Sequence, residues 1–357
     1  MNFVLHPLPV AESVTLETKA VLRQCARAHR HLAELKGVAA SIPNESILID
    51  TLALQEAKDS SAIENIITTQ DELFRAEVGG DPSVSPAAKE VQNYTAALKV
   101  GFQRVRGTGL IRLEDILEVQ ATLEQNRAGL RKLPGTVLKN QQTGEVIYEP
   151  PQDAVEVERL MDNLIAFLND ETMADLDPLV KMAVIHYQFE SIHPFYDGNG
   201  RTGRILNLLY LVTQGLMDIP ILYLSRYIIR TKADYYRHLQ TVRTEADWEG
   251  WLLYLIRGVE ETSLDSVGRV VAIRTLMQQT KHAIRERFPK IYSQDLLNNL
   301  FRHPYTKIEF IERDLGVSRP TATKYLEQLA AAGVLKKQKM GRTNYFINEQ
   351  LFTLLTA

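Results

Sequence analysis

Apolar side chains recur at the 3.6-residue spacing of an α-helix along most of the 357 residues. The spacing holds from Val14 to Phe74, where Ala, Leu, Glu and Lys are frequent, and again from Ala87 to Gln125. Residues 79–86 are rich in Gly, Pro and Ser and indicate a surface loop between these segments. The sequence contains no internal repeat or low-complexity tract. The pattern therefore predicts a mostly α-helical protein.

The hydrophobic pattern changes between Leu133 and Pro151. Thr136–Lys139 and Glu145–Tyr148 are rich in β-forming residues, and a polar turn separates them at 140–144. This arrangement predicts a β-hairpin within a helical protein. A surface excursion without a function is the alternative interpretation of the same pattern.

One helix is expected on each side of a short segment that contains glycine. Asp177 and Pro178 are suited to an N-cap and a first helical position, and the helix is expected to continue to Ile192 and to stop at Pro194. The next helical pattern covers Arg201–Thr213. The segment between them is therefore expected to lie where two helices meet.

Helical patterns also cover 232–242 and 248–263, and the tryptophans of the second are expected to pack in the core. Near the C-terminus, 307–314 and 319–332 predict two helices joined by a short turn. A β-hairpin is expected between Val334 and Ile347, with its tip at 340–342. Helix, turn, helix and hairpin in this order are typical of a winged helix-turn-helix.

The composition is that of an ordinary globular protein, with 45% hydrophobic and 24% charged residues. A net charge of −3 excludes a uniformly basic nucleic-acid binder but allows a local basic patch. Cys25 is the only cysteine, so an intramolecular disulfide or a cysteine-rich metal site is excluded. The N-terminus lacks the pattern of an export signal, and no apolar run reaches membrane-spanning length. A cytoplasmic protein without membrane contact is expected.

The segment HPFYDGNGRTGR, residues 193–204, has the features of a phosphate site. Gly198 and Gly200 allow the backbone to bring its N–H groups close to an anion, and the loop leads into a helix N-terminus. Arg201 and Arg204 lie three residues apart at the start of that helix, and arginine offers paired donors to phosphate oxygens.

Two further side chains of the segment have chemistry that suits a nucleotide. Asp197 is the type of ligand that binds magnesium beside phosphates, and the His193 imidazole could take a proton from a hydroxyl. Each residue taken singly is more often structural; the combination in this order is hard to explain by packing. The segment is neither a Walker A loop, because GK[ST] is missing, nor a dinucleotide fingerprint after a strand.

The segment resembles the Fic-domain signature HPFxxGNGRxxR and matches it at each fixed position. The hairpin and the downstream Ala233–Tyr236 also fit this family, and the subgroup with an N-terminal helical segment and a C-terminal winged helix is similar from end to end. The expected fold is a helical Fic core with a β-hairpin flap, plus a C-terminal winged helix-turn-helix domain. The expected parts are an N-terminal helical segment with an inhibitory motif, a Fic catalytic core, a connecting helix and the winged-helix domain, at 1–113, 114–262, 263–284 and 285–357.

This resemblance implies a protein adenylyltransferase, which moves AMP from ATP to a Ser, Thr or Tyr hydroxyl of a target protein and of itself. His193 is then the expected base, and Asp197 the expected ligand of Mg²⁺ or Mn²⁺. The flap would hold the target segment by strand addition. A glycine at position 200 favours AMP transfer, because relatives that phosphorylate carry lysine there. The residues expected to contact the nucleotide are Gly198, Asn199, Gly200, Arg201, Thr202, Gly203, Arg204 and Tyr236.

Ser60–Asn65, reading SSAIEN, resembles the inhibitory motif [S/T]xxxE[G/N] of the same family. The resemblance implies that the Glu64 carboxylate pairs with Arg204, takes the arginine that the γ-phosphate needs, and repels that phosphate. An ordinary exposed glutamate on a helix is the alternative. In some relatives the same glutamate helps water to remove AMP, so a reverse activity stays open.

A second function class gives the main role to residues 285–357. Six basic residues and one acidic residue lie between Val317 and Asn344, in a chain that is acidic overall. Such a charge excess on a helix and wing suits DNA phosphates, so a DNA-binding regulator is the alternative function. Winged helices also bind proteins, and both partners stay open, as does a homodimer. The sequence does not identify the target protein.

Overall fold

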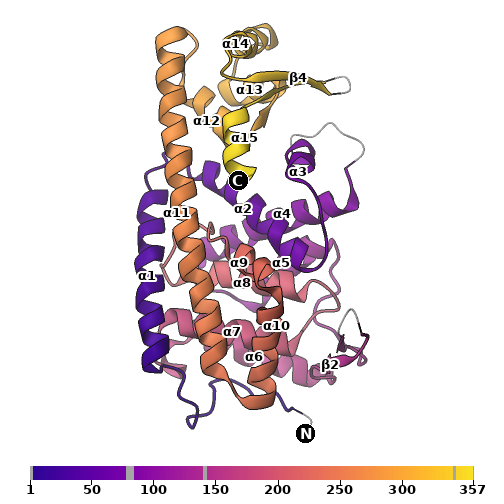
Figure 1. Cartoon of the computed structure of the whole chain (residues 1–357). Helices are drawn as coiled ribbons and strands as arrows, with labels where there is room; N and C mark the ends of the chain where they lie inside the picture. Colours follow the sequence, from indigo (N-terminus) through magenta and orange to yellow (C-terminus); the bar gives the residue numbers. More distant parts are fainter. Residues whose placement is uncertain (1–2, 78–83, 140–142, 341–342, 357) are drawn as a thin grey trace.

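The structure is a computed structural model that describes residues 3–77, 84–139, 143–340 and 343–356. It is mostly helical and elongated, with a larger helical body and a smaller C-terminal unit at one end (Figure 1). Among the described residues, no helix combines the length and the apolar run that crossing a bilayer requires.

Within the described residues, five helices form the N-terminal part. The predicted loop at 79–86 and the predicted hairpin turn at 140–144 lie partly outside the described residues. The helices before the hairpin are α1 (Lys19–Ala39), α2 (Glu45–Ile63), α3 (Gln70–Glu77), α4 (Pro86–Thr108) and α5 (Leu113–Glu124).

The predicted hairpin is present but has short strands, β1 (Leu138–Lys139) and β2 (Val146–Tyr148), which pair antiparallel. The polypeptide then returns to helices. These are α6 (Ala154–Asn169), the 3₁₀ turn η1 (Glu171–Met173), α7 (Pro178–Ile192), α8 (Asn199–Thr213), α9 (Leu224–Arg230), α10 (Lys232–Glu245) and α11 (Trp248–Arg287).

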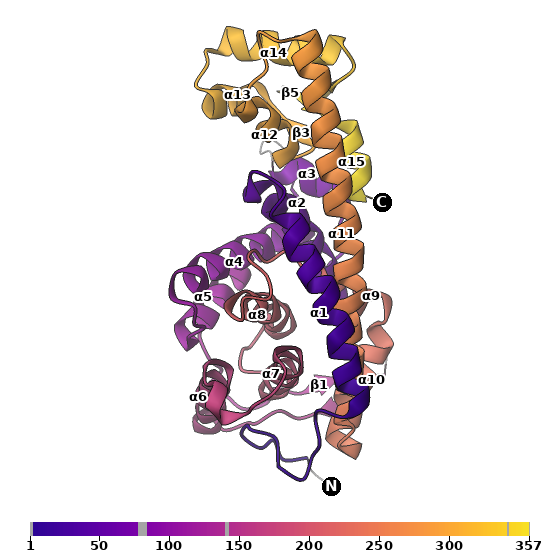
Figure 2. The same ribbon diagram turned by 90° about the vertical axis from the view of Figure 1, so that its left-hand side faces the viewer.

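Helices α7 and α8 form the centre of the body, between α1 and α11 on one side and α4, α5 and α6 on the other (Figure 2). Nearly every residue of α7 is buried, and so are most residues of α8. Asp177 caps α7 as predicted, because its side chain accepts from the Leu179 N–H while Pro178 takes the first helical position. The loop between α7 and α8 is therefore held between two buried helices.

The helix expected to end near Ser263 continues without a break to Arg287, so the expected core and connecting helix share α11. The middle of α11 stays apolar on one side, and that side packs against α1 and α7. Trp251 is fully buried as expected, whereas Trp248 is half-buried at the first turn.

The C-terminal unit contains the two predicted helices and hairpin, and three elements that the pattern did not indicate. Its elements are α12 (Gln294–Arg302), β3 (Tyr305–Thr306), α13 (Ile308–Leu315), α14 (Arg319–Ala331), β4 (Lys336–Met340), β5 (Thr343–Ile347) and α15 (Glu349–Thr356). The sheet order is β3–β5–β4, antiparallel throughout. The missed α12, β3 and α15 are short, and short elements carry little periodic pattern. Residues 341–342 of the expected wing tip lie outside the described residues.

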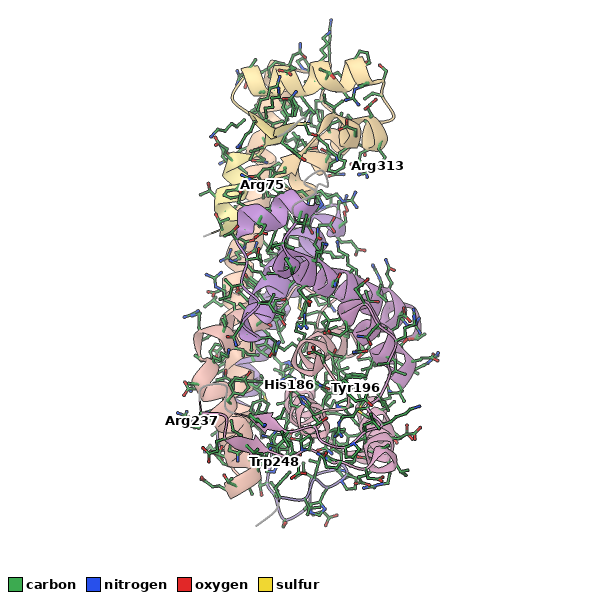
Figure 3. The ribbon with its side chains drawn as sticks, turned by 90° about the vertical axis from the view of Figure 1, so that its right-hand side faces the viewer. Arg75, His186, Tyr196, Arg237, Trp248 and Arg313 are labelled. Atoms are coloured by element: carbon green, nitrogen blue, oxygen red, sulfur yellow. The ribbon has the colours of Figure 1, made fainter. Side chains whose placement is uncertain are left out.

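Charged and polar contacts dock the C-terminal unit on the N-terminal helices. The buried Asp50 of α2 pairs with Lys99 of α4 and with Arg302 of α12, and the Tyr305 hydroxyl donates to Asp71 of α3. Arg75 pairs with the same Asp71 and lies where α3 meets the C-terminal unit (Figure 3). The unit is thus in direct contact with α2, the helix that ends in the SSAIEN motif.

Candidate functional site

His193 is the C-cap residue that follows the last residue of α7, and its backbone is in the left-handed region, with φ 49°. Its N–H donates to the Phe189 oxygen at 2.9 Å, so the helical hydrogen bonding continues up to His193. Pro194 cannot continue the helix, since it has no N–H to donate. The imidazole is thereby placed at the mouth of the loop between α7 and α8.

The loop is closed by Asn199. Its side-chain oxygen accepts from the Phe195 N–H and its amide nitrogen donates to the Phe195 oxygen, both at 2.8 Å. Gly198 has φ 78°, a conformation that a side chain disfavours, and it caps the start of α8. Helix α8 therefore begins two residues earlier than predicted. The Asn199 side chain is committed to the loop, so a phosphate contact by this residue would use its backbone N–H.

Burial and the nearby Arg131 guanidinium lower the pKa of His193 to about 4. The imidazole is therefore neutral at pH 7, the state in which it can accept a proton. Its Nδ1 atom is buried and has no hydrogen-bond partner within the described part of the chain.

Arg201 is buried between two carboxylates of the N-terminal part. Its guanidinium contacts Glu90 of α4 at 2.6 Å and Glu124 of α5 at 2.8 Å, and its side chain is 5% exposed. Glu124 also lies directly above Gly198. Arg201 therefore clamps α4 and α5 to the start of α8.

Arg204 forms an ion pair with Glu64 of the SSAIEN motif. Its guanidinium contacts Glu64 Oε1 at 2.9 Å and the Ser60 hydroxyl at 2.8 Å, and also donates to the Ser60 main-chain oxygen. Although burial acts to raise the pKa of Glu64, the Arg204 guanidinium brings it below its ordinary value. The Glu64 carboxylate is thus ionised beside Arg204, across the 140 positions that separate the two residues.

The backbone at the end of α2 explains the residue types of the motif. Glu64 is the C-cap of α2 rather than an interior residue, and Asn65 follows in the left-handed region with φ 64°. Asn and Gly are the residues that adopt this conformation most readily. The turn directs Glu64 over the first turn of α8, where a Cβ at Gly200 would lie 2.5 Å from Glu64 Oε1.

The remaining predicted nucleotide contacts differ in accessibility. Tyr236 of α10 is 46% exposed and packs edge-on against Tyr235, with ring centroids 5.2 Å apart. Thr202 and Gly203 are buried, and Gly203 faces Glu190 of α7. Gly203 therefore lies where α8 packs on α7, and the buried Thr202 hydroxyl has no hydrogen-bond partner within the described part of the chain.

Asp197 is exposed, and its Oδ1 accepts from the Gly198 N–H at 2.7 Å. Among the described residues, no group of three or more His, Cys, Asp or Glu side chains could hold a metal ion by itself. Magnesium beside phosphates needs only one or two protein carboxylates, since phosphate and water supply the other ligands. A single exposed carboxylate beside the loop fits that mode of binding.

The hairpin lies next to the same loop. The Tyr148 hydroxyl donates to the Ser191 oxygen at 2.8 Å, and the Arg243 guanidinium lies 3.9 Å from the Tyr148 ring centroid. A groove of about 950 Å³ runs between the N-terminal segment, β2 and α10. Val146 and Ile147 line it and are half-exposed, so β2 presents an apolar edge to this groove.

Several residues of the site were missed in the sequence. Glu90, Glu124 and Arg131 lie in segments without a motif, and their partners within 193–204 are more than 60 positions away. The sequence did offer an indication for Glu190, because it is a carboxylate in a helix that is buried nearly throughout. Burial raises its pKa to about 7.

His186 was also missed. It is fully buried (Figure 3) and contacts the Tyr235 hydroxyl and the Asn207 amide while stacking on Trp251. Burial lowers its pKa to about 3, so it is a neutral packing residue.

Three protein-family models match separate parts of the chain. The Fic/DOC family N-terminal model matches residues 22–103, the Fic/DOC family model 110–211, and the model for the C-terminal domain of SoFic-like protein adenylyltransferases 276–351. Together they cover more than half of the chain.

Curated relatives are named protein adenylyltransferases. One from Caenorhabditis elegans is 31% identical over 35% of this chain and 22% of its own length. A probable one from Aquifex aeolicus is 38% identical over 23% of this chain and 24% of its own length. The chain thus spans about a quarter or less of these two relatives.

Solved structures support the fold along the whole chain. A Fic family protein from Desulfovibrio desulfuricans G20 aligns over 95% of this chain and 98% of its own, with TM-score 0.60 and 20% identity. Fic-1 from C. elegans aligns over 70% of this chain and 73% of its own, with TM-score 0.52 and 22% identity. These likenesses support the fold, and the two matched Fic/DOC models, together with the HPFYDGNGRTGR segment, show that the chain belongs to the Fic/DOC family.

Proposed function

We propose that this protein transfers AMP from ATP to a Ser, Thr or Tyr hydroxyl of a target protein. The observation that carries the proposal is a neutral His193 at the mouth of a glycine loop that opens a buried helix N-terminus. The hydroxyl oxygen attacks the α-phosphorus, His193 takes the hydroxyl proton, and the bond to the leaving pyrophosphate breaks. The names of the curated relatives support this reaction class.

The phosphates would lie at the first turn of α8, where free N–H groups and the helix dipole favour negative charge. Gly198, Asn199 and Gly200 would contribute backbone N–H groups, and Tyr236 would border the nucleotide. Arg204 would bind the γ-phosphate through paired donors once Glu64 has moved away. Asp197 would hold Mg²⁺, which supplies positive charge to the phosphates.

Arg201 would act differently from the original expectation. Both of its terminal nitrogens contact carboxylates, so it would keep the loop in place and supply positive potential beneath it. Catalysis of phosphate transfer depends mainly on positioning and charge stabilisation, so a braced arginine contributes to both.

Inhibition by Glu64 is part of the proposal. Its carboxylate contacts Arg204 and lies above Gly200, the place where a phosphate would approach α8. A charged group in this position occupies the arginine and repels an incoming phosphate. The Glu64 side chain is 33% exposed, so it can leave without unpacking the core.

The test is label transfer from two forms of ATP. Wild type and Glu64→Gly protein are incubated with ATP labelled on the α- or the γ-phosphate, with Mg²⁺ or Mn²⁺, alone and with cell lysate. Protein-bound label is expected from the α-labelled form only, with more for Glu64→Gly. Label from the γ-phosphate, or no label from either form, would reject AMP transfer.

DNA binding by residues 285–357 is the second candidate, supported by the basic excess of the helix and hairpin. The carboxylates around them weaken it, since Arg319 pairs with Glu309 and Glu312, and Lys336 and Lys337 pair with Glu349 and Glu327. Filter binding over a salt series tests it, because each phosphate contact adds to the salt dependence of the affinity.

A further inference from the structure

Arg131 has a buried guanidinium with an unusual set of partners. The residue is 1% exposed and lies between the end of α5 and the hairpin. Within the described part of the chain its side-chain donors go to main-chain carbonyl oxygens: His193 at 2.8 Å, Ile192 at 3.2 Å, and Pro151. A buried arginine usually pairs with a carboxylate, so this arrangement calls for an explanation.

The carbonyl groups that Arg131 contacts belong to two functional elements. Ile192 and His193 end α7, where carbonyl groups lack helical partners, and Pro151 ends the segment that leaves β2. The main-chain N–H of Arg131 also donates to the main-chain oxygen of Pro194 at 2.8 Å. One residue therefore joins the base-carrying turn to the hairpin.

The turn at His193 needs such support. A residue other than glycine is disfavoured in the left-handed region and persists there only where surrounding contacts impose it. The next residues add to these contacts, since the N–H groups of Lys132 and Leu133 both donate to the Tyr196 hydroxyl.

The charge of Arg131 also affects the pKa of His193. Burial is the largest cause of the lowered His193 pKa, Arg131 and Arg243 lower it further, and Glu64 and the main chain at Glu190 act in the opposite direction. Loss of the Arg131 charge should therefore raise the pKa of His193 toward its ordinary value of 6.5.

We propose that Arg131 is a positioning residue that fixes the main chain of the base His193 and ties the flap hairpin to it. The base and the hairpin that holds the target then keep one relative position, and the fixed cation helps to keep the imidazole neutral. This inference rests on the proposed AMP transfer.

The test compares Arg131→Met, Arg131→Lys and the control Arg127→Met in the Glu64→Gly protein. Methionine removes the charge and the hydrogen bonds, while lysine keeps the charge and cannot reach all three carbonyl groups. Arg127 is a nearby arginine that is 77% exposed and paired with Glu118, outside the site. Transfer kinetics are measured against pH, and the His193 imidazole is titrated by NMR with labelled histidine, assigned with His193→Ala.

For Arg131→Met we expect kcat to fall by about tenfold or more, because small displacements of a reacting group cost that much. The acid limb of kcat/KM and the His193 titration should both move to higher pH. Arg131→Lys should lower kcat with both titrations near those of the parent protein, and Arg127→Met should change neither. Misfolding alone would reduce the active fraction without moving the pH profile.

An unchanged His193 titration in Arg131→Met, together with unchanged kcat, would overturn the proposal. If Arg131→Met does not fold, Arg131→Lys decides, since full activity in that variant contradicts the positioning role. If the parent protein transfers no AMP, the proposed function fails. The NMR titration still decides whether Arg131 acts on His193.

Discussion

Two regions of the N-terminal part reach the same helix α8 in different ways. Helices α4 and α5 bring Glu90 and Glu124 to Arg201, whereas the end of α2 brings Glu64 to Arg204. Arg201 is held from two sides by carboxylates of different helices. Arg204 meets one carboxylate, on a side chain at the last turn of a helix.

From this difference we expect a structural clamp at Arg201 and a displaceable contact at Arg204. Removal of Arg201 from its partners would leave carboxylates without compensation, one of them 10% exposed, whereas Glu64 can turn toward solvent. Similar ion pairs one turn apart can therefore have opposite roles, because the surroundings of the carboxylate decide whether it can leave. Four predictions test this comparison.

The largest effect is expected for His193→Ala. The comparison of Arg201 with Arg204 bears on AMP transfer only if transfer depends on this base. Loss of a general base lowers a rate by about a hundred- to ten-thousandfold. The measurement is protein-bound label from α-labelled ATP in the Glu64→Gly background, with nucleotide affinity measured separately. Affinity should stay near that of the parent protein, and transfer at the parent rate would remove His193 from the mechanism.

Glu64→Gly should raise transfer, because it frees Arg204 and removes a repulsive charge. A hydrogen bond to a charged group contributes about 1.5–3 kcal/mol, which corresponds to about a ten- to hundredfold change in rate. If Glu64 were an ordinary exposed residue, the change would cost about 1 kcal/mol of stability or less and leave transfer unaltered.

The double variant Glu64→Gly with Arg204→Ala is the control for this gain. The gain should disappear when the freed arginine is absent, which appears as non-additivity between the two changes. If the double variant is as fast as Glu64→Gly alone, Glu64 does not act through Arg204.

Arg201→Ala should destabilise the fold as well as lower transfer. Removing one partner of a buried pair costs about 3–5 kcal/mol, since Glu124, which is 10% exposed, would stay buried without compensation. Thermal unfolding of Arg201→Ala and of the charge-conserving Arg201→Lys is the measurement, and lysine should restore part of the loss. An unfolding temperature equal to that of wild type would contradict the clamp.

Glu90→Gln should have the smallest effect. Glu90 is 39% exposed, and exposed ion pairs contribute about 0–1 kcal/mol, so stability and transfer should stay close to wild type. The matched change Glu124→Gln, at a 10% exposed carboxylate, should have the larger effect of the two. If Glu90→Gln lowered stability and transfer more than Glu124→Gln, the clamp would act mainly through Glu90 of α4.

The sequence predicted the helices and the loop at 178–213 well because their signals are local. Asp177 and Pro178 mark the start of α7, and Pro194 and the glycines mark the loop within two residues. Capping, turn and helix-breaking preferences act over a few positions, so they can be read without the fold. The contact between Glu64 and Arg204 was also predicted, on the strength of a family motif rather than a local pattern.

The C-terminal unit was predicted less completely. Its two central helices and hairpin were recognised, but the pairing of its basic residues with carboxylates was not. Charge counted along a sequence does not indicate which charges are neutralised by neighbours in space. The helices at 248–263 and 263–284 were both expected, but their continuity as the single helix α11 was not, because a periodic pattern does not by itself mark where one helix ends and the next begins.

The sequence by itself determined the helical class, the loop between α7 and α8, and the residue types that suit phosphate chemistry. These depend on backbone preferences and on side-chain chemistry, which each residue carries with it. Only the tertiary structure decided that Arg201 lies between two carboxylates while Arg204 contacts that of Glu64, and that Arg131 contacts the main chain of His193. These contacts join segments 60 to 144 positions apart, and their burial sets the charge state of His193. Such properties exist only when the chain is packed, because burial and distance are features of the fold and not of the residues.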